Sequence, residues 1–221
     1  MNVKKILLGS ILLCVSGMMA CTGQKQSSAK AADTIALAPC PAFQSDSAMQ
    51  YVEDQCAFGP RLPESEASAL CGDYIIEKFE KFGTQVREQT ADVTIYDGSK
   101  VSARNIIASI NPENPDRILL CAHWDCRPWA DHDPNPDNHH TPVMGANDGA
   151  SGVAVMLEIA RVLQQQPVKL GIDFVCFDVE DMGTPEWAEE ELVLLVELHI
   201  ISNIFHQKQK ESVTDVVRNL Y

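Results

Sequence analysis

The sequence has few basic residues, no internal repeat, no low-complexity segment and no apolar run as long as the ~20 residues of a membrane span. Its 17 Lys and Arg against 31 Asp and Glu give a net charge of −14, which argues against binding to nucleic acid. Its 45% hydrophobic and 22% charged residues are typical of a globular protein and exclude a disordered chain. The 221 residues suffice for one domain with a substantial core.

The first 20 residues have the pattern of an export signal, with Lys4 and Lys5 before a short apolar stretch. The stretch ends in GMMAC, which resembles the lipobox of bacterial lipoproteins, with Cys21 as the residue to be lipidated. We therefore expect a signal peptide over 1–20 and a polar tether over 21–44, in a protein lipid-anchored in the bacterial cell envelope and facing the periplasm. A secreted protein cleaved nearby is the alternative.

Six cysteines lie beyond the lipobox, and the oxidising envelope would allow some of them to pair. Cys121 and Cys176 lie in apolar strand patterns, which predicts buried thiols. A disulfide between Cys40 and Cys71 is a hypothesis only, because connectivity cannot be read from the sequence.

Three segments have the apolar spacing of helices: 45–59, 65–83 and 149–167. Ser45 and Ser47 are the candidate N-caps of the first. The predicted apolar face of the second consists of Leu70, Tyr74, Ile75, Phe79 and Phe82. That of the third consists of Val153, Met156, Leu157, Ala160, Val162 and Leu163.

Strands are predicted over 91–98 and 101–110, joined at Asp97-Gly98, and over 116–123 and 169–181. Because strands alternate with helices and the last strand is almost wholly apolar, we expect an α/β domain with a mixed sheet that is parallel at its centre. Ligands bind beyond the carboxyl ends of the strands in such sheets. His123 and Glu180 both stand at such ends.

Three short segments at these ends carry metal-binding residue types: AHWD, GANDGASG and DVED. Zinc binds imidazole nitrogen and carboxylate oxygen, and Asp148 lies in a Gly-rich loop that can fold tightly around an ion. The side chains of Glu180 and Asp181 diverge, so one can bind metal while the other acts as acid and base. Taken singly, His123 is a structural histidine, Asp148 a helix cap and the acidic pair a solvated strand end. Together they indicate a site.

The segments AHWD, GANDGASGVAVMLEIAR and FVCFDVEDMGTPEW resemble the zinc-dependent glutaminyl-peptide cyclotransferases of bacteria, which have the animal-type glutaminyl cyclase fold. That family is related to the zinc aminopeptidases with a co-catalytic metal pair. The resemblance runs from about Cys40 to Trp187 and is most specific in HWDCRPWADHDP and PVMGANDGASG. It implies a zinc-exopeptidase-like α/β fold, a twisted mixed sheet with helices on both faces, here incomplete.

The resemblance assigns roles to five residues. It places metal ligands at Asp148 and Asp181, and a proton shuttle at Glu180. His123 matches the second-metal ligand of the aminopeptidases and, in the single-zinc cyclases, a wall of the site. Trp187 matches a residue of the substrate pocket, whereas Trp124 and Trp129 are interpreted as packing residues. In this interpretation Asp125 is another wall, and 131–133 belong to a surface loop that shapes the pocket.

The implied activity is cyclisation of the N-terminal glutamine of peptides or proteins to pyroglutamate, with release of ammonia and with one zinc ion as cofactor. The expected partners are such peptides and, through Cys21, the membrane, but no nucleic acid. The alternatives are a zinc aminopeptidase of the same fold and a non-catalytic envelope lipoprotein that kept the motifs without the metal. Gln-peptides and Leu-anilides would distinguish the two enzymes.

The resemblance ends after Trp187, and residues 188–221 form a divergent tail. Family members continue for roughly another hundred residues, a length consistent with ordinary domain sizes. Their continuation holds the third zinc ligand, a histidine. We therefore expect a truncated, partial domain over 45–187 that is either inactive for want of that ligand or unfolded for want of half its sheet, with His199 and His206 as weak replacement candidates.

Overall fold

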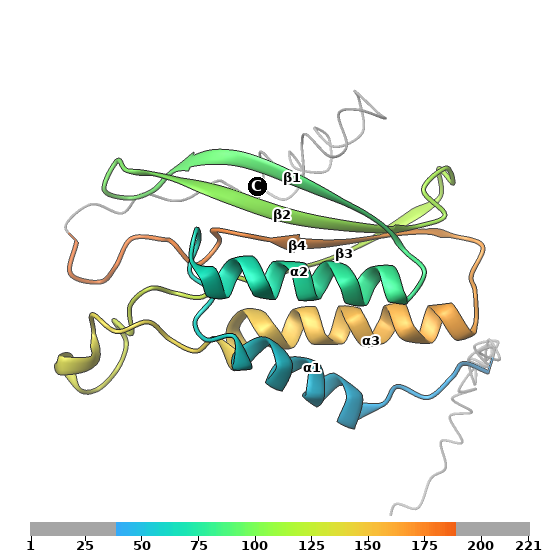
Figure 1. The fold of residues 1–221 in the computed structure, drawn as a ribbon, viewed down its shortest axis with the longest axis horizontal. Coiled ribbons are helices and arrows are strands. Elements are labelled where there is room, and N and C mark those ends of the chain that lie inside the picture. Colours follow the sequence, from blue (N-terminus) through green and yellow to red (C-terminus); the bar gives the residue numbers. More distant parts are fainter. Residues whose placement is uncertain (1–38, 189–221) are drawn as a thin grey trace, which may run out of the picture. The chain divides into compact units, whose positions relative to one another are not determined.

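The computed structural model describes residues 39–188. The predicted signal peptide, Cys21, His199, His206 and the divergent tail lie outside the described residues. Within this range three α-helices and a four-stranded sheet follow one another in the chain (Figure 1). Among residues 39–188, none of the three α-helices could serve as a membrane span.

The helices are α1 (Ser45–Ala57), α2 (Glu66–Lys81) and α3 (Ser151–Gln165), which confirms the three predicted helices. Ser65 caps α2 by accepting a hydrogen bond from the Ser68 backbone N–H. The residue before α1 is Gln44, and no side chain caps this helix, so the predicted Ser45 or Ser47 cap is wrong.

The apolar face of α2 differs from the prediction at one position. Cys71, Ile75 and Phe79 recur every four residues and are fully buried, whereas Leu70 is 49% exposed. The i, i+4 row that meets the sheet therefore begins one residue later than predicted. Phe79 contacts Phe174 of the sheet, with ring centroids 5.3 Å apart.

The strands are β1 (Gln85–Thr94), β2 (Lys100–Ile110), β3 (Arg117–His123) and β4 (Gly171–Phe177), in the order β1-β2-β4-β3. The pairs β1–β2 and β2–β4 are antiparallel and β3–β4 is parallel. The mixed sheet is confirmed, but in the described range its parallel pair lies at one side and not at the centre.

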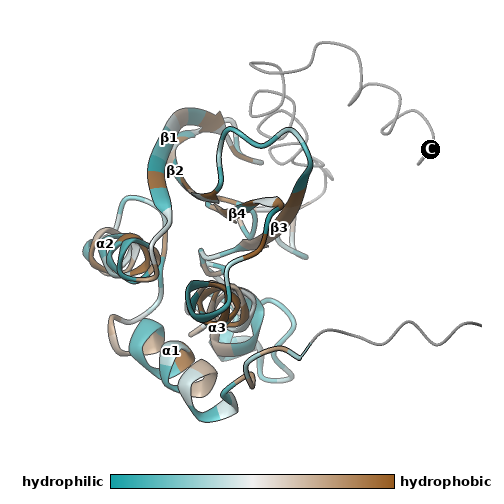
Figure 2. Ribbon diagram, turned by 90° about the vertical axis from the view of Figure 1, so that its right-hand side faces the viewer, coloured by the Kyte–Doolittle hydropathy of each residue, from teal (hydrophilic) through white to brown (hydrophobic). Residues whose placement is uncertain are grey.

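All three helices described here lie on one face of the twisted sheet (Figures 1 and 2). The main core lies between them and the sheet and includes Ile75, Phe79, Leu157 and Phe174. On the other face, Ile107, Val175 and Phe177 form a smaller apolar cluster. The sequence analysis expected helices on this second face as well. None is found there within residues 39–188.

The cysteines only partly follow their predictions. Cys40 is exposed and Cys71 is fully buried, and both are free thiols, so the hypothesised bridge between them is absent. Cys176 on β4 is buried as predicted. Cys121 is exposed, because β3 is the outer strand of the described sheet.

The parallel pairing of β3 and β4 brings two functional segments together. His123 lies opposite Phe177 at the last register position, and the Trp124 N–H donates to the Phe177 carbonyl at 2.9 Å. The segments that follow β3 and β4 therefore leave the sheet at the same edge. The turn Ala146–Ala150, which leads into α3, reaches this edge as well.

Candidate metal centre

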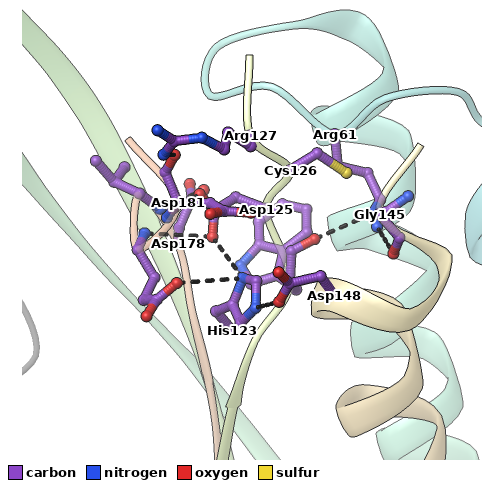
Figure 3. Close-up of polar contacts among 12 residues, drawn as sticks. Arg61, His123, Asp125, Cys126, Arg127, Gly145, Asp148, Asp178 and Asp181 are labelled. Atoms are coloured by element: carbon purple, nitrogen blue, oxygen red, sulfur yellow. Dashed lines mark hydrogen bonds and ion pairs between the residues drawn. The ribbon is translucent and has the colours of Figure 1, made fainter. Parts of the chain in front are cut away.

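Three residues from three separate segments form a compact donor cluster (Figure 3). One nitrogen of His123 and one carboxylate oxygen each of Asp148 and Asp181 all lie within 4.8 Å of one another. His123 Nε2 is 2.9 Å from Asp148 Oδ1. His123 ends β3, Asp148 lies in the turn before α3, and Asp181 follows β4. The structure thus offers His123 as a third donor beside the two aspartates that the sequence analysis expected to bind the metal.

Glu180 lies beside this cluster. Its Oε2 is 3.7 Å from His123 Nδ1, and its side chain is 39% exposed. The side chains of Glu180 and Asp181 therefore take different positions at the same edge. A carboxylate so placed can reach both solvent and a ligand held at the metal donors.

Asp125 connects the segments on either side of the cluster, although sequence reasoning treated it as a wall. It is fully buried, and its carboxylate accepts the backbone N–H of Glu180 at 3.3 Å and of Asp181 at 3.0 Å. It also lies 3.3 Å from His123 Nδ1. Residues i and i+2 of an extended chain share one side, so the spacing of His123 and Asp125 was a usable signal.

A second buried carboxylate, Asp131, supports the segment after β4. It is 2% exposed and pairs with Arg127, whose Nε donates to Asp131 Oδ1 at 2.7 Å. Arg127 also donates to the carbonyls of Asp181 and Thr184, and Asp131 accepts the Glu186 N–H. The interpretation of 131–133 as a surface loop is therefore wrong for the buried Asp131, whereas His132 is exposed and Asp133 is half-buried.

Trp187 lies in a row of rings next to Arg127. Its ring centroid is 5.9 Å from that of Trp129 and 4.6 Å from that of His140, and Trp129 in turn contacts Tyr96 at 5.3 Å. Trp187 is 44% exposed and so offers a free aromatic surface. Trp124 is fully buried, as predicted for a packing residue.

The turn that carries Asp148 requires a glycine. Gly149 has φ 99°, and a Cβ there would lie 2.7 Å from the Asp125 carbonyl oxygen and 3.4 Å from His123 Cε1. Only a residue without a side chain lets this backbone approach the end of β3 so closely. The sequence DG at 148–149 thus brings the Asp148 carboxylate to His123.

The charges of the cluster favour a cation. Burial raises the pKa of Asp181 to about 6, with Asp125 and Asp148 adding to the rise and His123 and Arg127 opposing it. Burial lowers the pKa of His123, but its contacts with Asp125 and Asp148 and the charge of Glu180 outweigh this and raise it to about 9. One imidazole and two carboxylates are a zinc-type donor set, so the residues present fit a bound zinc ion.

Comparisons with known proteins identify relatives of the same fold. The model of peptidase family M28 matches residues 105–191. A glutaminyl cyclase structure from Bacteroides thetaiotaomicron is 52% identical, with a TM-score of 0.68 over 69% of this chain and 52% of that chain. The Tannerella forsythia glutaminyl cyclase is 49% identical, with a TM-score of 0.67 over 69% and 52% of the two chains.

A leucine aminopeptidase precursor from Bacteroides thetaiotaomicron is similar to the same degree. It is 52% identical, with a TM-score of 0.69 over 70% of this chain and 53% of that chain. The chain therefore spans about half the length of these solved structures. The resemblance to bacterial glutaminyl cyclases and the zinc-exopeptidase-like fold are confirmed.

The Arg127–Asp131 pair makes the stability of the chain depend on pH. The Arg127 hydrogen bond, against the effect of burial, lowers the pKa of Asp131 from 3.8 to about 2. The contribution of the Arg127–Asp131 pair to the free energy of unfolding is therefore complete above pH 3.8 and is lost as the pH falls through about 2. We expect Asp131→Asn to lower the free energy of unfolding by about 2 kcal/mol at pH 7, with the difference from wild type shrinking near pH 2.

Urea unfolding at pH 7, 4 and 2.5 measures this difference. The control is Asp137→Asn, because Asp137 is exposed in the same loop. We expect this control to change stability by less than about 0.5 kcal/mol. Equal effects of the two substitutions at pH 7 would contradict the role of the buried pair.

Proposed function

We propose that the chain is a zinc-dependent glutaminyl-peptide cyclotransferase, which converts the N-terminal glutamine of peptides or proteins to pyroglutamate and releases ammonia. The observation that carries the proposal is the donor cluster of His123, Asp148 and Asp181 with Glu180 beside it. Support comes from the 49–52% identity to two bacterial glutaminyl cyclases.

Asp148, Asp181 and His123 would hold one zinc ion, with His123 in the place that the resemblance gives to a downstream histidine. When bound, zinc supplies a Lewis acid for the γ-amide carbonyl of the substrate. Three protein ligands leave an open position, as a catalytic site requires. Asp125 keeps the ring of His123 oriented through Nδ1 and keeps Nε2 directed at the donor cluster.

Glu180 would act as base and then as acid. The α-amine nitrogen of the substrate forms a bond to the γ-amide carbon, and the bond from that carbon to the amide nitrogen breaks. Glu180 takes the proton from the attacking amine and delivers it to the leaving nitrogen, which departs as ammonia. Trp187 would form one wall of the substrate pocket, beside Trp129.

An aminopeptidase of the same fold is the second candidate. The 52% identity to a leucine aminopeptidase precursor favours it. Its reaction consumes water, whereas cyclisation uses the substrate's own amine as nucleophile. Ammonia release from Gln-peptides supports the cyclase, and arylamine release from Leu-anilides supports the aminopeptidase.

We expect Glu180→Gln to lower turnover of a Gln-peptide by at least about a hundredfold, the usual contribution of a general base. Zinc remains bound, because Glu180 is not one of the three donors. Ammonia release and zinc content, measured on the same samples, check this expectation. The control is Glu186→Gln, an exposed carboxylate that pairs with His132. Full activity of Glu180→Gln would exclude the proposed role.

We expect His123→Ala to weaken zinc binding by about tenfold or more, because one of three ligands is lost. The control is His132→Ala, because His132 is 73% exposed and pairs only with Glu186 among the residues described here. Competition with a chromophoric chelator measures both dissociation constants. Unchanged zinc affinity in His123→Ala would contradict its assignment as a ligand.

We also propose that Cys21 anchors the protein in the bacterial envelope, facing the periplasm, and the GMMAC motif supports this location. Expressed in a bacterium with labelled fatty acid, the wild-type chain should incorporate label and sediment with membranes. Cys21→Ser should lose both properties. A label that persists in this variant would place the lipid elsewhere or refute the anchor.

A further inference from the structure

Arg61 is a fully buried arginine that the proposed reaction does not use. Its Nε donates to the Trp124 carbonyl at 3.0 Å, its Nη1 to Met144 at 2.8 Å and its Nη2 to Gly145 at 2.7 Å. Its own carbonyl accepts the Cys126 N–H at 3.1 Å. One residue thus joins the segment after β3 to the turn that precedes α3 (Figure 3).

The guanidinium group is held by backbone groups and not by a counter-ion. No carboxylate within residues 39–188 lies within 4.0 Å of it. Arginine is rarely buried so completely without such a partner. Three carbonyl oxygens arranged around one rigid planar fork fix the relative positions of both segments more firmly than the rotatable donors of an ammonium group would.

The turn packs against this guanidinium without spare room. Gly145 has φ 63°, and a Cβ there would lie 2.7 Å from Arg61 Nη2 and 2.5 Å from Cys126 Sγ. The Gly145 carbonyl accepts both from Arg61 and from the Ala150 N–H at 3.1 Å. The two ends of the turn around Asp148 therefore meet on one oxygen that Arg61 holds.

The Asp148 side chain has little support of its own. It is 75% exposed, and its partner among the described residues is His123. The distance between the Asp148 and His123 donors therefore depends on the backbone of the turn. At the other end of the turn, the Cβ position of Gly149 lies 3.6 Å from Arg61 Nη2 and 3.4 Å from His123 Cε1. The guanidinium thus lies close to the backbone of Gly149, the residue that follows Asp148.

We propose that Arg61 is a positioning residue that holds Asp148 at its distance from His123 and Asp181, so that the zinc donors are already assembled before the ion binds. The proposal rests on the proposed zinc site. A positioning role and a purely electrostatic role of Arg61 predict opposite changes in zinc affinity when Arg61 is removed. A positive charge behind a cation site repels the cation, so its removal alone would tighten zinc binding. Loss of positioning weakens it.

The experiment measures zinc dissociation constants of the full chain and its variants by chelator competition, together with the visible spectrum of the Co²⁺ form. We expect Arg61→Gln to bind zinc about tenfold or more weakly, as for other groups that orient metal ligands. Arg61→Lys keeps the charge but loses the fork and should show a smaller loss. The Co²⁺ spectra of both should change, because the ligand geometry changes.

Two further variants separate positioning from stability. Gly145→Ala moves the acceptor away from Arg61 and should weaken zinc binding in the same way, even if Arg61→Gln fails to fold. Arg117→Gln breaks the Asp173 pair at the opposite end of β3 and should lower thermal stability without changing zinc affinity. Circular dichroism establishes which variants are folded.

Unchanged or tighter zinc binding by folded Arg61→Lys and Gly145→Ala would overturn the role of Arg61 and leave the zinc site intact. A wild-type chain that binds no zinc would overturn the zinc site and the role of Arg61 together. The two failures are thus distinguishable.

Discussion

Four aspartates lie close together at one edge of the sheet, and much of the surrounding structure offsets their mutual repulsion. Burial and the charge of Asp125 raise the pKa of Asp178 to about 7, and burial with Asp125 and Asp148 raises that of Asp181 to about 6. Backbone N–H groups donate hydrogen bonds to the two most buried carboxylates. Asp125 accepts two such bonds, and Asp178 accepts those of Arg104 and Val179. Asp148 and Asp181 receive less support of this kind. The repulsion that remains is concentrated where a cation would relieve it.

Two arginines hold the segments that carry these aspartates, and both act on carbonyl oxygens. Arg61 holds the turn before Asp148, and Arg127 holds the segment after Asp181. Their charges are placed differently. Arg127 is neutralised by the buried Asp131, whereas Arg61 has no carboxylate partner within residues 39–188. The guanidinium fork suits this task because it donates to several carbonyls at once, whereas a carboxylate placed there would add to the repulsion.

The parts of the fold that depend on local sequence pattern could be predicted from the sequence. The parts of the candidate site that depend on residue type could be predicted as well. Three helices, the Asp97-Gly98 turn and the apolar β4 follow from periodicity and turn residues, and His123, Asp148, Glu180 and Asp181 follow from their places at strand ends and in a glycine loop. What depends on long-range contact was missed. The burial of Asp131 comes from Arg127 and a backbone N–H 55 residues away. The exposure of Cys121 comes from strand order, which composition does not reveal. Arg61 shows no local pattern, because its acceptors are carbonyls 63 to 84 residues along the chain.

The two neighbouring acids after β4 owe their different surroundings to a backbone feature. Val179 has φ 68° and is fully buried, an unfavourable conformation for a β-branched residue. It persists because its side chain packs with Ile95, Ala103 and Met182 and its N–H is bound by Asp178. Beyond this reversal both following N–H groups turn inward to Asp125, so the backbone of Glu180 and Asp181 is fixed while their side chains diverge. Asp181 is placed among the metal donors, and Glu180 remains more open to solvent beside His123. The same strained turn thus separates the proposed ligand from the proposed acid–base group, and backbone strain of this kind is commonly retained at functional sites.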